Sequence, residues 1–481
     1  MASLLLSSIQ RALLSLIQSA TVVTRRLMPA SAAHRLASLA RPVISAVATP
    51  VGVRFEDRPV ALVAWQPLLP RSAFASGPIV LVNNALAAGG AERQIVNTLR
   101  GIAERRGVTG GLLCLRLHET KEMDFFLPAF RDFPGFIRNA MPAGEAEAKL
   151  RSILPPEAAD KIRDAIAWLP HDVQADIFRL VAEFAILKPS VVHGWQDATS
   201  IIAAYAAWLV GVPRILVSAR NLAPPHFRYM RSYMRDAYRE IASCAPVVMI
   251  NNSEAGARDY ARWLDLPPER FTVKRNGVDT AAIHRPAPQA IADFRAKLGV
   301  PAAAKVVGSM MRFFAEKQPL LWIEVAALIA QRHADCYFVL FGDGPMQNET
   351  VALAKARGIG DRLICPGMIA DTAAALSLLD VFLMTSKMEG TPNVVLEASL
   401  LGVPVVSTDA GGAREAIAQG VTGYVAPDFQ PQSLARCVLT ILDEPDWCEG
   451  VKREGPAFVA QRFGLERMIE DTMALYGLRA G

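Results

Sequence analysis

The sequence has few cysteines, no long apolar run and no strong excess of either charge. Its six cysteines stand far apart without a Cys-x-x-Cys pair, which argues against a disulfide framework or a zinc site and favours buried thiols in a reducing compartment. Polar residues interrupt the apolar run 4–17, which therefore falls short of the roughly 18 residues of a membrane span. A net charge of +5 lacks the basic excess of a nucleic-acid binder, so we expect no nucleic acid as a partner.

Acidic residues are absent from the first 55 positions, which carry six arginines before the first acid at Glu56. Within this stretch, the apolar residues between 5 and 17 fall near one helical stripe. We expect residues 1–75 to form a basic arm outside the core fold. Three interpretations stay open: a helix in peripheral contact with a membrane surface, a transit peptide, or a disordered arm.

At 481 residues the chain is too long for one ordinary core and predicts two domains. The pattern places an N-terminal domain at 76–280, with a helical insertion at about 116–190, and a C-terminal domain at 281–457. Residues 458–481 are predicted to be helical and to cross back to the N-terminal domain.

Apolar runs of strand length alternate with helical patterns, which predicts parallel sheets covered on both faces in an α/β fold. A strand is expected to begin at Val191 and to end in polar residues. The other expected strands are 79–82, 214–218 and 247–251 in the first half, and 305–310, 337–341, 363–365, 381–384 and 403–407 in the second.

One stretch of the second half combines a strand, a turn and a helix with two carboxylates. The turn 390–393 precedes an apolar helix, and amides at a helix N-terminus favour a phosphate. Glu389 and Glu397 frame this turn and could accept hydrogen bonds from the hydroxyls of a sugar and a ribose. The pattern indicates a nucleotide-sugar site with Gly390, Thr391 and Asn393 near a phosphate. The alternative is a solvated loop glutamate and an ordinary helix glutamate.

Cations and glycines follow other strands of this half. Arg312 and Lys317 come after the strand 305–310 and suit a pyrophosphate, with a solvated pair as the alternative. Glycine at Gly342 leaves room for a flat base, whose edge backbone groups near Met368 could read. Plain turns are the rival interpretation there.

The first half offers a glycine turn and several polar strand ends. Gly89 and Gly90 lie between a strand and a helix, where backbone can approach a ligand phosphate, although a tight turn explains the pair equally well. His193 lies near the end of its strand and could serve a cleft or be satisfied in the domain interior. Arg220 and Asn221 are candidate acceptor-site residues, with a salt bridge or a loop cap as the alternative.

Taken together, the segments 389–398, 402–406 and 409–415 resemble glycosyltransferase family 4, whose members are retaining enzymes of the GT-B fold. The resemblance implies that Glu389 contacts the donor sugar and Glu397 the ribose. It further places His193 beside the donor sugar and the acceptor hydroxyl. By the same likeness, the donor phosphates are bound by Gly89, Gly90, Arg312 and Lys317.

The resemblance implies two Rossmann-like domains facing across a cleft and a retaining sugar transfer in the cytoplasm. The sequence of segment 194–197 departs from the usual family pattern. It resembles the corresponding segment of polysaccharide-assembly transferases, which suggests a lipid-linked or other glycan acceptor. No Asp-x-Asp occurs, so we expect a metal-independent reaction with a nucleotide sugar as substrate and no cofactor. Two alternatives stay open: a nucleotide-sugar epimerase and a non-catalytic scaffold on a transferase fold.

Overall fold

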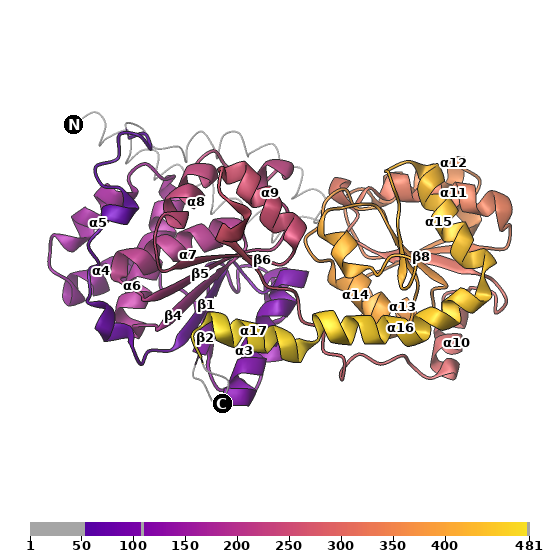
Figure 1. Ribbon diagram of the computed structural model, residues 1–481, viewed down its shortest axis with the longest axis horizontal. Coiled ribbons are helices and arrows are strands. Elements are labelled where there is room, and N and C mark those ends of the chain that lie inside the picture. The colour runs from indigo at the N-terminus through magenta and orange to yellow at the C-terminus, as the bar shows by residue number, and fades with distance from the viewer. Residues whose placement is uncertain (1–52, 107–109, 479–481) are drawn as a thin grey trace. The chain divides into compact units, whose positions relative to one another are not determined.

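The computed structural model describes residues 53–106 and 110–478, which divide into two compact units (Figure 1). The first unit holds the described chain up to Asn251, the segment Ala257–Thr272 and the chain from Thr472 onward. The second unit holds Asn252–Gly256 and Val273–Asp471. The sequence pattern placed the start of the second domain at residue 281. The second unit therefore begins earlier in the chain than predicted.

The first unit is built on a seven-stranded sheet with the order β3-β2-β1-β4-β5-β6-β7. Neighbouring strands from β3 to β6 pair in parallel, and the order reverses between β1 and β4, as in a doubly wound fold. The strands are β1 Ile79–Asn83, β2 Gly110–Cys114, β3 Phe136–Asn139, β4 Val191–Trp195, β5 Arg214–Ala219, β6 Val247–Asn251 and β7 Phe271–Val273.

Helices connect these strands, and α7 is the most enclosed of them, because nearly all of its residues are buried. Its sequence is rich in alanine and large apolar residues, which lets it pack against α6 and the sheet. The helices are α3 Gly90–Arg106, α4 Ala143–Ile153, α5 Ala158–Ile166, α6 His171–Leu187, α7 Asp197–Val210, α8 Met234–Ala242 and α9 Glu254–Leu264.

The segment 116–190 differs from the helical insertion that the sequence pattern suggested. It contains α4, α5 and α6, but it also contains β3, which forms the edge of the seven-stranded sheet. This strand is short and only partly buried, so it lacks the apolar run that reveals the central strands.

The expectation that all of residues 1–75 lie outside the core was too broad. The Trp65 indole donates a hydrogen bond to the Leu209 carbonyl at 2.9 Å, and Phe74 is fully buried. The Leu62 amide donates to the buried carboxylate of Glu240 at 2.8 Å. The stretch from Leu62 to Phe74 is therefore part of the first unit. The predicted membrane-surface helix lies in 1–52, outside the described residues.

The second unit carries a six-stranded sheet with the order β10-β9-β8-β11-β12-β13, and its strand pairs are parallel. The order reverses between β8 and β11. Of these strands, β13 was not expected from the sequence. The strands are β8 Val306–Met310, β9 Tyr337–Phe341, β10 Leu363–Gly367, β11 Val381–Met384, β12 Val405–Ser407 and β13 Gly423–Val425.

Two apolar cores lie on the two faces of this second sheet, one including Phe382 and Leu396 and the other including Trp322 and Leu383. The prediction of two doubly wound α/β units is confirmed. The helices are α10 Pro288–Lys297, α11 Pro319–Arg332, α12 Gln347–Ala356, α13 Thr372–Ser377, α14 Asn393–Leu400, α15 Pro431–Asp443, α16 Pro445–Phe463 and α17 Leu465–Leu475.

The last helices bear on two earlier expectations. The predicted helix at 458–481 is two helices, because α16 ends before Gly464 and α17 begins after it. The chain from Thr472 onward groups with the first unit. Within the described part of the chain, no helix combines the length and the apolar character that crossing a bilayer requires.

Candidate active site

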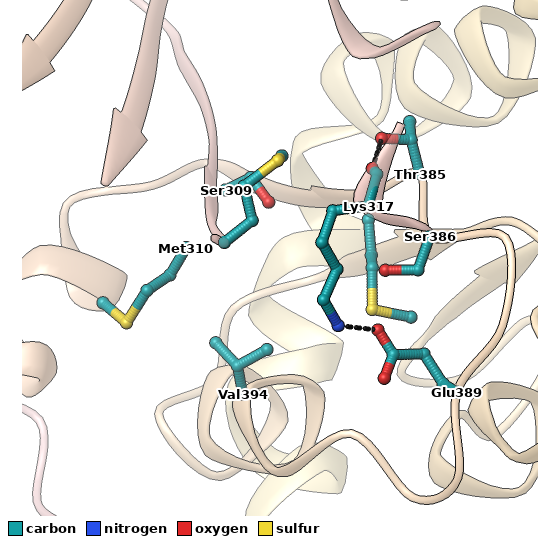
Figure 2. A pocket seen from close by; sticks show the side chains of 9 residues that line it. Ser309, Met310, Lys317, Thr385, Ser386, Glu389 and Val394 are labelled. Atoms are coloured by element: carbon teal, nitrogen blue, oxygen red, sulfur yellow. Dashed lines mark hydrogen bonds and ion pairs between the residues drawn. The ribbon is translucent and has the colours of Figure 1, made fainter. Parts of the chain in front are cut away.

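The second unit has a pocket at the point where its strand order reverses. The strands β8 and β11 are neighbours there, and their carboxyl ends open on the same edge of the sheet. In doubly wound sheets this position is the usual place for a small ligand. The pocket is lined by Ser309, Met310, Met311, Lys317, Met384, Thr385, Ser386, Glu389 and Val394 (Figure 2).

Lys317 and Glu389 face each other across this pocket. The Lys317 ammonium donates a hydrogen bond to the Glu389 carboxylate, and both side chains are largely buried (Figure 2). The Thr385 hydroxyl donates to the Lys317 carbonyl at 3.0 Å, which fixes the backbone that carries the lysine. A cation and a carboxylate are thus held together where a charged ligand would enter.

The backbone of Glu389 is fastened by the glycine loop that follows β12. The Glu389 amide donates to the Ala410 carbonyl at 2.9 Å, and the Gly412 amide donates to the Glu389 carbonyl at 3.1 Å. Gly411 has φ +71°, which favours glycine. A Cβ atom on Gly412 would lie 2.3 Å from the Gly390 carbonyl oxygen, so the two backbones meet too closely for a side chain.

The turn before α14 is held by polar groups of the same unit. The Thr391 hydroxyl donates to the Asn252 carbonyl at 2.7 Å. The Asn276 amide group donates to the Thr391 carbonyl at 3.0 Å and to the Asn393 side-chain oxygen at 2.7 Å. The side chains of Thr391 and Asn393 therefore fix the turn, and sequence reasoning gave Asn276 no such role. The sequence feature that could have pointed to Asn276 is its position in the Arg-Asn-Gly turn at 275–277.

Glu397 lies in α14, one turn after the helix begins at Asn393, and only 5% of its surface is exposed. Its position places a carboxylate close to the start of a helix that opens at the edge of the pocket, where Val394 contributes to the lining. The role of Glu397 toward a ribose stays a prediction.

The two cations predicted to bind phosphate are not in the same environment. Lys317 lines the pocket, whereas the Arg312 side chain is 66% exposed and is not among the lining residues. Arg312 lies 3.8 Å from the Glu316 carboxylate and near the Phe314 ring. The structure thus brings Lys317 to Glu389 but leaves Arg312 in solvent.

Gly342 and Met368 follow neighbouring strands. The Gly342 amide donates a hydrogen bond of 2.8 Å to the carbonyl of Gly367, the residue directly before Met368. A Cβ atom on Gly342, which has φ +123°, would lie 1.9 Å from the Met311 carbonyl oxygen. Met368 itself is 72% exposed. The glycine is required for a close backbone approach, and contact with a base stays a prediction for both residues.

The first unit also gathers polar groups at the carboxyl edge of its sheet, around Gly89 and Gly90. Gln196 follows β4, and its amide group donates to the Glu92 carboxylate at 2.7 Å. A Cβ atom on Gly89 would lie 2.2 Å from the same carboxylate. Gln196 has φ 62° and ψ 164°, a conformation that residues other than glycine rarely adopt. The sequence assigned no role to Glu92, and it pointed to Gln196 only as part of the segment 194–197 near the acceptor.

His193 is fully buried in the first unit. Its Nδ1 shares a hydrogen bond of 2.7 Å with the Tyr476 hydroxyl, and its ring packs 4.9 Å from that of Trp195. Burial raises the pKa of Tyr476, so the phenol stays protonated. These contacts fit the interior alternative for His193, and its role in transfer stays a prediction.

Arg220 and Asn221 follow β5. The Arg220 guanidinium lies 4.5 Å from the centre of the Trp195 ring. Burial lowers its pKa to about 9, although Glu92 acts in the opposite direction. The Asn221 side chain accepts from the Leu222 amide at 2.9 Å, and its carbonyl accepts from Asn251 at 3.1 Å. These contacts fit the loop-cap alternative for Asn221, and an acceptor role stays a prediction for both residues.

Asp197 is a buried carboxylate that sequence reasoning did not single out. It begins α7 and accepts hydrogen bonds from Tyr229 at 3.1 Å, from Tyr238 at 2.9 Å and from Tyr260. Burial raises its pKa, and the three hydroxyls oppose this effect. Its three tyrosine partners are distant in sequence, so the sequence alone could not reveal these contacts. The one available signal was the position of Asp197 directly after the end of a strand.

A metal centre was not expected, and metal independence stays a prediction. Within 53–106 and 110–478, His, Cys, Asp and Glu form no cluster of three or more that could hold an ion.

A model of the family described as glycosyl transferases group 1 matches residues 290–457. The Vi polysaccharide biosynthesis protein VipC/TviE of Salmonella typhi is 31% identical over 410 residues, which cover 82% of this chain and 70% of that protein. The chain belongs to this glycosyltransferase family. The alpha-D-kanosaminyltransferase of Streptomyces kanamyceticus is 30% identical over 34% of this chain and 43% of its own length.

Solved glycosyltransferase structures share the fold. Anabaena Alr3699/HepE in complex with UDP-glucose aligns with a TM-score of 0.63 and 20% identity, covering 84% of this chain and 100% of that one. WaaG, a glycosyltransferase involved in lipopolysaccharide biosynthesis, aligns with a TM-score of 0.59 and 16% identity, covering 84% and 100%. The predicted GT-B fold of this glycosyltransferase is confirmed. Its finer assignment to family 4 stays a prediction.

Proposed function

We propose that this glycosyltransferase moves a sugar from a nucleotide-sugar donor to a glycan acceptor during polysaccharide biosynthesis. The observation that carries the proposal is the Lys317–Glu389 pair in a pocket where the strand order reverses. The roles of the Salmonella protein in Vi polysaccharide biosynthesis and of WaaG in lipopolysaccharide biosynthesis support a glycan acceptor and a polysaccharide pathway.

The donor enters with its diphosphate toward Lys317 and the start of α14. The ammonium and the helix amides stabilise the negative charge of the leaving diphosphate, as a divalent ion does in other transferases. Arg312 is exposed and can swing toward the same phosphates when they bind. The UDP-glucose in the Anabaena structure supports a uridine nucleotide as the donor.

The two glutamates then contact neutral hydroxyls. Glu389 accepts hydrogen bonds from the transferred sugar, and Glu397 accepts them from the ribose. Both carboxylates are largely buried, so these hydrogen bonds form away from bulk water, where they orient the donor more firmly.

Transfer proceeds with retention of the anomeric configuration. The bond from the anomeric carbon to the phosphate oxygen breaks, and the acceptor oxygen bonds to the same face of the sugar. The acceptor proton passes to the departing phosphate oxygen, so the step needs no enzymic nucleophile. His193 supports this arrangement from the acceptor side by orienting hydroxyls.

The acceptor is a lipid-linked glycan at the cytoplasmic face of the plasma membrane. The acid-free segment 1–55 motivates this location, because each arginine near an anionic surface adds about 1 kcal/mol of attraction. Sedimentation with phosphatidylglycerol vesicles should exceed that with phosphatidylcholine vesicles. Equal sedimentation with both would contradict the membrane proposal.

A donor panel tests the proposal. Thermal unfolding is followed with UDP-, GDP- and ADP-sugars, since a ligand at about 100 times its Kd adds roughly 2.7 kcal/mol to stability. The proposal predicts stabilisation by a nucleotide sugar and slow release of nucleoside diphosphate that persists in EDTA. Absence of stabilisation by any donor contradicts sugar transfer, and full inhibition by EDTA that magnesium reverses contradicts metal independence. Conversion of the donor into another nucleotide sugar would instead indicate an epimerase.

A further inference from the structure

The loop at residues 220–233 connects β5 to α8, both labelled in Figure 1. Its amino-acid composition is unusual. It follows the carboxyl end of β5, at the edge of the first sheet where His193 and Gln196 also lie. It contains three arginines, one histidine and three aromatic residues but no aspartate or glutamate. Loops at this edge of a doubly wound sheet commonly bind ligands.

This loop is fastened to the first unit by three aspartates from other elements. Arg231 donates to Asp172 at 2.6 and 2.9 Å in a two-pronged contact. The His226 ring lies 2.9 Å from the Asp259 carboxylate, which also accepts from the Ala223 amide. These contacts hold the loop in one conformation before any ligand binds, which lowers the entropic cost of binding.

A third attachment is the hydrogen bond of 3.1 Å from the Tyr229 hydroxyl to Asp197. Although its hydroxyl is tied down, Tyr229 is 44% exposed, and its neighbour Met230 is 40% exposed. The Tyr229 ring is stacked almost parallel on Phe227, with the planes 8° apart and the centres 5.2 Å apart. The loop therefore presents a flat aromatic surface in a fixed orientation.

Arg228 lies between these two rings in the sequence and is exposed. Within the described residues it forms no ion pair and no hydrogen bond, in contrast to Arg231 and His226, which both contact aspartates. An exposed guanidinium in the same short segment as two stacked aromatic rings suits a ligand that combines an apolar face with a carboxylate.

We propose that Phe227, Arg228 and Tyr229 form a binding platform for an acidic glycan acceptor. The aromatic faces carry partial negative charge and stack against the weakly positive C–H face of a sugar ring. The Arg228 guanidinium pairs with a carboxylate on that ring or the next one. This inference rests on the proposed function and specifies the acceptor as a chain that contains uronic acid residues.

A membrane surface is the other ligand that a basic and aromatic loop could contact. An aromatic residue that enters a bilayer points its apolar part away from the protein into the lipid and keeps its polar end at the headgroups. In this loop the polar end of Tyr229 is instead bound inward to Asp197, and the exposed part is a flat ring stacked on Phe227. The geometry favours a sugar ring over a membrane.

Calorimetric titration with two probes of equal length, tetragalacturonate and maltotetraose, tests the platform in the full chain. The acidic probe should bind more tightly than the neutral one. Tyr229→Ala removes the ring and should weaken both probes about tenfold, whereas Tyr229→Phe keeps the ring and should bind within about threefold of the parent protein. Arg228→Gln should weaken tetragalacturonate about tenfold and leave maltotetraose unchanged. Phe429→Ala, an exposed aromatic of the second unit, is the matched control and should change neither.

UDP binding is measured on every variant, which separates this inference from the proposed donor site. The midpoint of thermal unfolding, measured on the same variants, verifies that each one is folded. Failure of the parent protein to bind tetragalacturonate while UDP binds normally overturns the platform and leaves the donor proposal standing. An unchanged affinity in Tyr229→Ala also overturns it. Sedimentation with phosphatidylglycerol vesicles that is lost in Tyr229→Ala would identify the loop as a membrane contact instead.

Discussion

Lys317 and Glu389 are 72 residues apart in sequence, yet the lysine ammonium donates a hydrogen bond to the glutamate carboxylate. One residue follows β8 and the other follows β11, the two strands between which the sheet order reverses. The fold therefore brings the two charges together, and no local sequence signal connects them. A donor diphosphate that binds Lys317 competes with Glu389 for the ammonium and leaves the carboxylate available for a sugar hydroxyl.

Lys317→Met should lower the affinity for nucleoside diphosphate about ten- to a hundredfold. The reason is the loss of a charge-assisted hydrogen bond worth roughly 1.5 to 3 kcal/mol. Calorimetric titration with UDP provides the measurement. Lys305→Met is the control, because Lys305 precedes the same strand at its other end and contacts Asp380 at 3.5 Å. Equal losses in both variants would contradict the role given to Lys317.

Most of the central strands and the motif loops could be predicted from the sequence, because these strands are apolar runs that end in polar or glycine-rich turns. Strand β11, for example, matches its predicted range of 381–384. The strands β2, β3 and β13 were missed. Strands β3 and β13 are short and lie at the edges of their sheets, whereas β2 is buried but begins with two glycines. Short strands at an edge lack the apolar pattern on which such predictions depend.

Sequence motifs predicted the residues of the site but not the contacts that these residues make with one another. Glu389 and Lys317 were both named, but their ion pair depends on which strands become neighbours. The exposure of Arg312 and the enclosure of His193 by Tyr476 also depend on tertiary packing. Asn276 and Asp197 were overlooked because their partners come from distant parts of the chain.

Gly412→Ala should lower turnover while the chain still folds. The added Cβ atom would meet the Gly390 carbonyl, so the loop that positions Glu389 must shift. Steady-state donor consumption and the midpoint of thermal unfolding are measured together. Gly450→Ala is the matched control, since no atom lies within 4 Å of its added Cβ atom. Turnover in Gly412→Ala equal to that of the control would show that the loop does not position Glu389.

Asp197→Asn should change how stability depends on pH. Burial raises the pKa of Asp197 in the folded state, so the folded protein binds more protons than the unfolded chain above the ordinary carboxyl range. In that window the free energy of unfolding falls as pH rises, and the neutral asparagine removes this loss. The melting temperature of the variant relative to the parent protein should therefore increase as the pH rises above the ordinary carboxyl range of about 4. A constant difference as the pH rises would contradict the prediction.

Trp65→Ala should destabilise the first unit by about 3 to 5 kcal/mol, the usual cost of removing a large buried aromatic side chain. Trp65 is 8% exposed and donates a hydrogen bond to Leu209, whereas nearby Val63 is 56% exposed. Val63→Ala is therefore the control, and its unfolding midpoint in urea should stay close to that of the parent protein. Similar midpoints for both variants would place the segment outside the fold.

We propose that one pocket binds a nucleotide sugar, with Glu397 contacting the ribose and Glu389 contacting only the transferred sugar. Calorimetric binding of UDP to Glu389→Gln and Glu397→Gln tests it most directly, with transfer kinetics measured beside it. Glu397→Gln should lose about ten- to a hundredfold in UDP affinity, because UDP carries the ribose. Glu389→Gln should keep UDP affinity almost intact while turnover falls. Loss of UDP binding in Glu389→Gln with retention in Glu397→Gln would contradict the roles proposed for the two glutamates.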